Sequence, residues 1–279
     1  MKIEHVAAFS DNGVGGNPAG VVIGETLPDA HMMRETAANL GYSETVFAAP
    51  YLDGWRVRYF SPESEVPFCG HATIALAAIL ARKFGNGEFH LHLNHTDIIV
   101  MGAEQAGDLK ASLMSPLTTS KRASAKLVQE ALDLFGWDEN VLDNQIPPAR
   151  INAGAEHLVL AFKSRQTLRE MEYNLDHGRV LMRRNKLVTI ALVYSATPYL
   201  FHVRNAFASG GVLEDPATGA AAAALCGYLR VINWPQNGQI EIIQGEDMGK
   251  RSRICCQFEP NPNSPVTVAG SVRIMQSVG

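Results

Sequence analysis

Two short loops place proton-handling side chains directly before stretches of sequence that are rich in alanine. The first loop, residues 65–73 (EVPFCGHAT), contains His71, and the second, residues 214–219 (EDPATG), contains Asp215. The alanines that follow each loop predict a helix. The first backbone N–H groups of a helix have no partner within the helix and attract anions. Two such helix ends facing one cavity would hold a carboxylate beside acid–base groups, so the sequence indicates an active site.

A third candidate is Glu44, which follows residues 40–43 (LGYS) and opens an apolar stretch predicted to be a strand. A carboxylate at the mouth of a buried strand is a candidate general base; an exposed strand end is the alternative. His71 would tend to be neutral because a helix N-terminus disfavours the imidazolium, and a buried structural histidine is the alternative. Asp215 followed by Pro216 is also the expected N-cap and N1 pair of a helix.

The cysteines carry a weaker signal. Cys69 precedes the first alanine-rich helix and could be a thiolate there. A thiol-based racemase needs two thiols, however, and the loop at residues 214–219 has none, so we expect Cys69 to be a packing residue. The sequence contains no C-x-x-C pattern, which argues against a disulfide framework or a zinc site and favours the reducing cytoplasm.

A glycine-rich segment at residues 13–20 (GVGGNPAG) does not match a dinucleotide-binding fingerprint, because the third glycine of that pattern would fall on Pro18. We interpret the segment as a loop beside the site and predict that Asn17 contacts substrate. Residues 244–251 (QGEDMGKR) predict a hairpin connection that could also line the site. The sequence has no P-loop, nucleophile elbow or metal-binding cluster, so we expect neither a cofactor nor a metal.

Composition excludes several partners. The 279 residues carry a net charge of −4, and basic residues do not alternate with aromatic ones in a stripe. Nucleic acid and anionic membranes are therefore not expected as partners. The longest uncharged apolar run, residues 72–81, falls far short of the roughly 20 residues that a membrane span needs, and the N-terminus reads as a strand rather than a signal peptide.

The order of predicted elements partly repeats. Strands are expected near residues 2–9, 19–23, 44–49, 55–60, 88–93, 97–103, 109–114, 157–162, 187–194, 200–207, 239–243, 251–258 and 265–275, and helices near 29–40, 70–84, 126–135, 167–184 and 216–230. Residues 115–126 are polar and predict a linker. Each half holds many strands and one alanine-rich helix, which is slim enough to be wrapped by a curled sheet. High helix propensity alone is the other explanation of the alanines.

Five segments together resemble the PhzF-like family, which is named for phenazine biosynthesis. They are residues 16–22 (GNPAGVV), 40–45 (LGYSET), 59–73 (YFSP and VPFCGHAT), 214–219 (EDPATG) and 244–245 (QG), in the order that the family shows. The resemblance implies the diaminopimelate-epimerase-like fold, an α/β (α+β) architecture of two pseudo-symmetric domains with the site between them. Each domain would be a curled, mostly antiparallel sheet around a central helix. We expect a first domain of residues 1–118 and a second of residues 119–267. The strand near residues 268–279 is a candidate to return to the first domain.

The resemblance also implies a cofactor-free isomerase, usually a homodimer, that acts on a small carboxylic acid. The well-understood member moves a hydrogen within the ring of a dihydro-hydroxyanthranilate. By this resemblance Glu44 would remove and return the proton, while His71 and Asp215 would hold polar groups of the substrate and relay protons. The backbone amides implied to bind the substrate carboxylate are those of Gly70, Gly219 and Ala220.

One position departs from the phenazine-pathway enzymes. They carry serine after the glycine where this sequence has Ala220, so a hydroxyl contact to substrate is lost while the backbone amide remains. The substrate is therefore left open. Two alternatives are an amino-acid epimerase or racemase of the same fold and a non-catalytic protein that binds a small acid.

Overall fold

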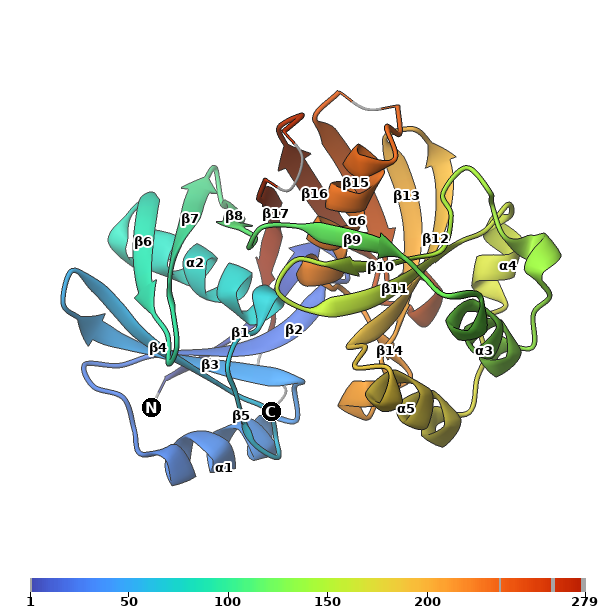
Figure 1. Cartoon of the computed structure of the whole chain (residues 1–279). Helices are drawn as coiled ribbons and strands as arrows, with labels where there is room; N and C mark the ends of the chain where they lie inside the picture. Colours follow the sequence, from blue (N-terminus) through green and yellow to red (C-terminus); the bar gives the residue numbers. More distant parts are fainter. Residues whose placement is uncertain (1, 236, 262–263, 277–279) are drawn as a thin grey trace. The chain divides into compact units, whose positions relative to one another are not determined.

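A computed structural model describes residues 2–235, 237–261 and 264–276, and Figure 1 colours them along the sequence. The chain divides into two compact units. Unit 1 holds the residues up to Met114 together with the chain from Ala269 onward, and unit 2 holds Ser115–Val268. Among the described residues, no helix is both long and apolar enough to cross a membrane.

Unit 1 is a curled sheet around a helix, with a second helix on its outer face. Its elements are β1 (Ile3–Ser10), β2 (Asn17–Ile23), α1 (Ala30–Leu40), β3 (Glu44–Tyr51), β4 (Gly54–Phe60), β5 (Glu65–Val66), α2 (Gly70–Phe84), β6 (Gly87–His92), β7 (Asp97–Gln105), β8 (Asp108–Met114) and the end of β17 (Val266–Ile274). β1 pairs antiparallel with both β2 and β17. β2 runs parallel to β3, and β4 runs parallel to β6.

The alanine-rich helix α2 is the centre of unit 1. It is buried from His71 to Ala81 and lies against β1, β2, β7 and β8 (Figure 1). The strand backbone comes very close to it: a Cβ added at Gly102 of β7 would lie 2.2 Å from the carbonyl oxygen of Ala77. Larger side chains would keep the helix and sheet apart. The alanines therefore allow close packing, as the wrapped-helix interpretation predicts.

Helix α1 covers the other face of β2 and β3. It begins at Asp29, whose carboxylate accepts a hydrogen bond of 2.9 Å from the N–H of Met32, and it ends at Gly41 in the left-handed conformation (φ 66°). Its buried residues Met33 and Ala37 pack on Val22, Phe47 and Phe60. The parallel pair β2–β3 is therefore covered on both faces, as parallel strands usually are.

Unit 2 repeats this arrangement with more helices. Its elements are β9 (Thr119–Arg122), α3 (Ala125–Phe135), the 3₁₀ turn η1 (Glu139–Val141), β10 (Ala149–Asn152), β11 (Glu156–Ala161), α4 (Arg165–Arg169), α5 (Leu175–Arg184), β12 (Thr189–Thr197), β13 (Leu200–Ala206), η2 (Ala208–Gly210), β14 (Glu214–Asp215), α6 (Gly219–Val231), β15 (Gln239–Gln244), η3 (Glu246–Met248) and β16 (Ser252–Phe258). α3 and α5 lie side by side, and α6 lies against β9, β10 and β16 (Figure 1).

Several strand pairings of unit 1 have a counterpart in unit 2. The antiparallel pair β1–β2 has its counterpart in β10–β11, and the parallel pair β2–β3 in β11–β12. The parallel pair β4–β6 around α2 matches β13–β15 around α6. The same order of pairings supports the predicted internal duplication and confirms the mixed α/β fold of two similar units.

Two expectations about unit 2 are wrong. The predicted linker at 115–126 contains strand β9, which pairs with β10; its polar side chains reflect an exposed strand, because three of its four residues face solvent. The predicted helix at 167–184 is two helices, since Asn174 caps a new helix by accepting from the N–H groups of Asp176 and His177. The end of the strand expected near 268–279, residues 277–279, lies outside the described residues.

Candidate active site

Glu44 is the first residue of β3, directly after the turn that follows α1. Gly41 ends the helix, and the Cα register aligns Glu44 with Ala19 of the parallel strand β2. This fixes the backbone of Glu44 at the end of a buried strand, while its side chain keeps 18% of its surface exposed. The residue is therefore at the mouth of the strand, as the sequence indicated.

His71 comes to Glu44 from the first turn of α2. Its Nε2 lies 3.5 Å from Oε2 of Glu44 and 3.4 Å from Oγ of Ser43, and its Nδ1 lies 3.3 Å from Sγ of Cys69. His71 and Cys69 are both buried. The structure thus brings together an acid, an imidazole and a thiol within one unit. The sequence predicts Cys69 to be a packing residue, but its thiol also contacts the His71 ring, because Cys69 is an extended N-cap residue.

A buried hydroxyl pair holds the start of α2. Thr73 Oγ1 donates to the carbonyl oxygen of Cys69 at 2.7 Å, so the phenol of Tyr59, 2.7 Å away, must donate to Thr73. Burial raises the pKa of Tyr59, which keeps this phenol protonated and able to donate. The side chain of the N-cap residue Cys69 makes no capping hydrogen bond, and among the described residues beyond its chain neighbours a Cβ added at Gly70 would come no closer than 4.0 Å, to the ring of Phe68. The first turn therefore has open space beside Gly70.

The ligand atoms of Glu44, Cys69 and His71 all lie within 4.8 Å of one another. Carboxylate, thiolate and imidazole are ligands for zinc-like ions, so among the described residues this is where a metal could be held. The expectations of no metal and no cofactor stay predictions.

Asp215 belongs to unit 2, where it ends the short strand β14 and pairs with Asn205 of β13. It does not cap helix α6, which begins three residues later with Thr218 at the N-cap. The Asp-Pro capping interpretation is therefore wrong, because pairing with β13 holds Asp215 in an extended conformation. Its carboxylate instead accepts a hydrogen bond of 2.5 Å from the hydroxyl of Thr218.

The other predicted binding residues lie at the starts of elements. Gly70 opens α2, and Gly219 and Ala220 open α6; the side chain of Thr218, the N-cap residue of α6, makes no capping hydrogen bond. Asn17 opens β2 and is 2% exposed; it lies two residues before Ala19, the register partner of Glu44. The sequence indicated that residues 244–251 could line the site but gave Gln244 no role; Gln244 ends β15 and is hydrogen-bonded to Thr218 and Asp215.

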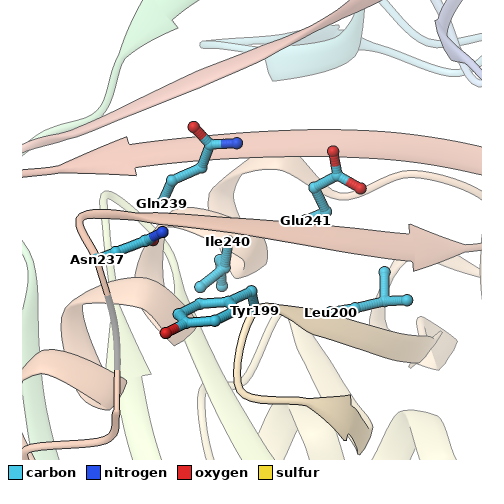
Figure 2. A pocket seen from close by; sticks show the side chains of 6 residues that line it. All are labelled: Tyr199, Leu200, Asn237, Gln239, Ile240 and Glu241. Carbon is cyan, nitrogen blue, oxygen red and sulfur yellow. The ribbon is translucent and has the colours of Figure 1, made fainter.

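A pocket of about 210 Å³ lies elsewhere in unit 2 (Figure 2). It is lined by Tyr199, Leu200, Asn237, Gln239, Ile240 and Glu241. Gln239 begins β15 and Gln244 ends it, which puts the pocket at the other end of that strand from Asp215. Glu241 is already paired with Arg253. The pocket contains none of the residues predicted for the site.

Comparison with known proteins agrees with the observed fold and identifies the class of enzyme. A family model described as phenazine biosynthesis-like protein matches residues 6–277. An uncharacterized isomerase of Halalkalibacterium halodurans is 31% identical over 229 residues, covering 80% of this chain and 79% of that protein. The trans-2,3-dihydro-3-hydroxyanthranilate isomerase of Pseudomonas aeruginosa is 29% identical over 260 residues, covering 91% and 89%.

Among solved structures, a PhzF-family phenazine biosynthesis protein of Bacillus anthracis superposes with a TM-score of 0.87 at 21% identity, covering 99% of this chain and 98% of that one. The fold and the relatives together define an isomerase built from two similar α/β units. The chain belongs to the phenazine biosynthesis-like (PhzF) family. The cleft between the two domains, the homodimer and the cytoplasmic location stay predictions.

Proposed function

We propose that the protein moves a proton within a small cyclic or unsaturated carboxylic acid without a cofactor, and that Glu44 removes and returns this proton. The pair formed by Glu44 and His71 carries the proposal: 3.5 Å separates Oε2 of Glu44 from Nε2 of His71 at the N-terminus of α2. The family and the isomerase names of its members support the reaction class.

The proposed chemistry balances without any other reactant. Glu44 takes a proton from one carbon of the substrate and becomes a carboxylic acid, while the electron pair spreads over the conjugated system. The same proton is then returned to another carbon on the same face. A placed base and donors that meet the developing charge are the elements that such a step needs.

The remaining groups would bind and orient the acid. The backbone amides of Gly70, Gly219 and Ala220 lie in the first turns of α2 and α6, where N–H groups favour a carboxylate. His71 and Asp215 would hold polar groups of the substrate and relay protons. Asn17, near the end of β2 that flanks Glu44, would add a further contact.

The substrate proposal takes account of Ala220. The Pseudomonas aeruginosa relative is named for trans-2,3-dihydro-3-hydroxyanthranilate, and the phenazine-pathway enzymes carry serine where this chain has Ala220. A methyl group cannot replace the hydrogen bond of a hydroxyl. We therefore propose a related unsaturated acid that lacks the polar group which that serine would contact.

A two-thiol epimerase is less well supported. Cys69 lies beside His71, but the described residues of the second loop include no cysteine. Cys226 lies two turns into α6 and has no exposed surface. A second thiol at the start of α6, which that mechanism needs, is therefore lacking from the described part of the chain.

Proton exchange in D2O tests the proposal. The wild type, Glu44→Gln and the control Glu63→Gln, which alters an exposed turn, are mixed with trans-2,3-dihydro-3-hydroxyanthranilate and with a panel of cyclic unsaturated carboxylic acids. Proton NMR then follows deuterium uptake and isomerisation. We expect Glu44→Gln to lower the exchange rate by about 10²–10⁴-fold while ligand binding persists, and Glu63→Gln to match the wild type. Exchange by Glu44→Gln at the wild-type rate would refute the role of Glu44.

A further inference from the structure

A row of polar side chains crosses the interior of unit 2. His157, Thr189, Asn205 and Gln244 belong to four different strands, β11, β12, β13 and β15, and each is at most 1% exposed. His157 Nδ1 lies 2.8 Å from Thr189 Oγ1, which lies 2.9 Å from Asn205 Oδ1. A cavity of only about 10 Å³ borders Asn205 and Gln244, room for about one water. Burying a polar group costs free energy unless it is hydrogen-bonded. We therefore asked what the hydrogen bonds along this row do.

Two backbone groups fix the orientation of the Gln244 amide. The N–H of Thr218 donates to Oε1 of Gln244 at 3.2 Å, and the carbonyl oxygen of Asp215 accepts from Nε2 of Gln244 at 2.7 Å. A backbone N–H can only donate and a carbonyl can only accept. A flipped amide would oppose both groups, so Gln244 has one orientation.

This orientation determines the protons along the row. Gln244 Oε1 must receive its second hydrogen bond, of 3.2 Å, from Nδ2 of Asn205, which turns Oδ1 of Asn205 toward Thr189. Thr189 has one hydroxyl proton and gives it to that oxygen. His157 Nδ1 must therefore carry a proton and donate it to Thr189. Burial lowers the pKa of His157 to about 4, so the ring is neutral, with its proton on Nδ1.

The other end of the row reaches a carboxylate. Gln244 Nε2 also lies 3.0 Å from Oγ1 of Thr218 and donates to it. The Thr218 hydroxyl is thereby occupied as an acceptor, and its own proton points to Oδ2 of Asp215 at 2.5 Å. Every side-chain hydrogen bond from His157 to Asp215 thus donates in the same direction. A hydroxyl that donates to a carboxylate favours the ionised form.

We propose that Gln244 is a positioning residue. By donating to the Thr218 oxygen, it makes the Thr218 hydroxyl donate its own hydrogen bond to Asp215. This hydrogen bond keeps the Asp215 carboxylate ionised and in one orientation. The row of Asn205, Thr189 and His157 holds the Gln244 amide in the orientation that this requires. The importance of the arrangement for turnover rests on the proposed function, in which Asp215 contacts substrate.

Charged neighbours of Asp215 on the same elements have other partners. Glu214 forms a buried ion pair with Arg204 at 2.6 Å, and Glu246, just after β15, pairs with Arg165 at 3.0 Å. Asp247 also pairs with Arg165, and His202 and Arg251 both pair with Glu246. The hydroxyl of Thr218 links the row of polar side chains in the strands to the Asp215 carboxylate.

The test is a titration of the Asp215 carboxyl carbon by ¹³C NMR in the full chain without substrate, with the signal assigned by its loss in Asp215→Asn. Thr218→Val removes the donor, and Gln244→Glu replaces the amide donor by an acceptor that draws the Thr218 proton away. Both should raise the pKa of Asp215 by about one or more. Thr218→Ser should restore the wild-type value. The controls are Thr119→Val and Gln239→Glu, which alter exposed positions in unit 2, and both should titrate as the wild type does.

Two results would overturn the proposal. One is an unchanged Asp215 titration in folded Thr218→Val; the other is a ¹⁵N spectrum of the wild type that places the His157 proton on Nε2. Because both readouts use the protein without substrate, they are independent of turnover. If Asp215→Asn exchanged substrate protons at the wild-type rate, the proposed role of Asp215 would fail, while the titration would still decide the role of Gln244.

Discussion

Acidification should destabilise the protein through His157, and the size of the effect follows from its burial. The residue has no exposed surface, and burial lowers its pKa from 6.5 to about 4 against the smaller opposing effect of Glu156. Between these pKa values the unfolded chain binds more protons than the folded one, so the free energy of unfolding falls as the pH falls. The two values correspond to a loss of about 2 to 3 kcal/mol between about pH 7.5 and about pH 4.5.

Urea unfolding of the wild type and of His157→Gln over this pH range measures the effect. Glutamine can still donate to Thr189 but does not titrate, so the variant should lose about 2 to 3 kcal/mol less than the wild type on acidification. Carboxylates with lowered pKa values, such as Glu65 and Glu246, also cost stability in acid, but they do so equally in both proteins. His95→Gln, at an exposed position, should follow the wild type. Parallel pH dependences of the wild type and His157→Gln would refute this reasoning.

Two further predictions concern packing and charge. Gly102→Ala should lower the free energy of unfolding by about 3 kcal/mol, because its Cβ would lie 2.2 Å from the carbonyl oxygen of Ala77. The control is Ala103→Val, which alters the next residue, on the exposed face of β7. Equal denaturation midpoints for the two variants would contradict the close packing of β7 on α2. Glu214→Gln should cost about 3 kcal/mol near neutral pH, because the Arg204 side chain is only 11% exposed and would lose its charged partner. Wild-type stability of that variant in urea would show that the ion pair contributes nothing.

The first candidate loop could be predicted well because its information is local. The alanine-rich stretch and the polar loop before it mark α2, and the observed helix has the predicted bounds, Gly70–Phe84. His71 and Glu44 also lie at the predicted places, in the first turn of α2 and at the start of β3. The contact of Cys69 with His71 could not be predicted from spacing, because residues two apart do not face each other on a helix and Cys69 is an extended N-cap residue.

The second loop could not be predicted as well because its structure depends on distant segments. In the sequence, Asp215 resembles a helix cap; in the structure, it pairs with β13 and lies in a strand. Gln244 has a role only through the loop at residues 215–218 and through Asn205, which lie far from it in sequence. Local propensity does not report such pairings. The same holds for β9, whose polar residues become a strand only beside β10.

Strand β17 has a consequence for the order in which the chain is made on the ribosome. Unit 2 is continuous in sequence, but β1 of unit 1 pairs with a segment near the other end of the chain, Val6 opposite Ile274. During synthesis, most of unit 2 can therefore be made while the residues of β1 that pair with β17, within residues 6–10, still lack those partners. The unit that contains Glu44 and His71 therefore receives its last strand only after unit 2 has been synthesised. A truncated product would thus combine a folded second unit with an unfinished first one, a form that chaperones and proteases can recognise.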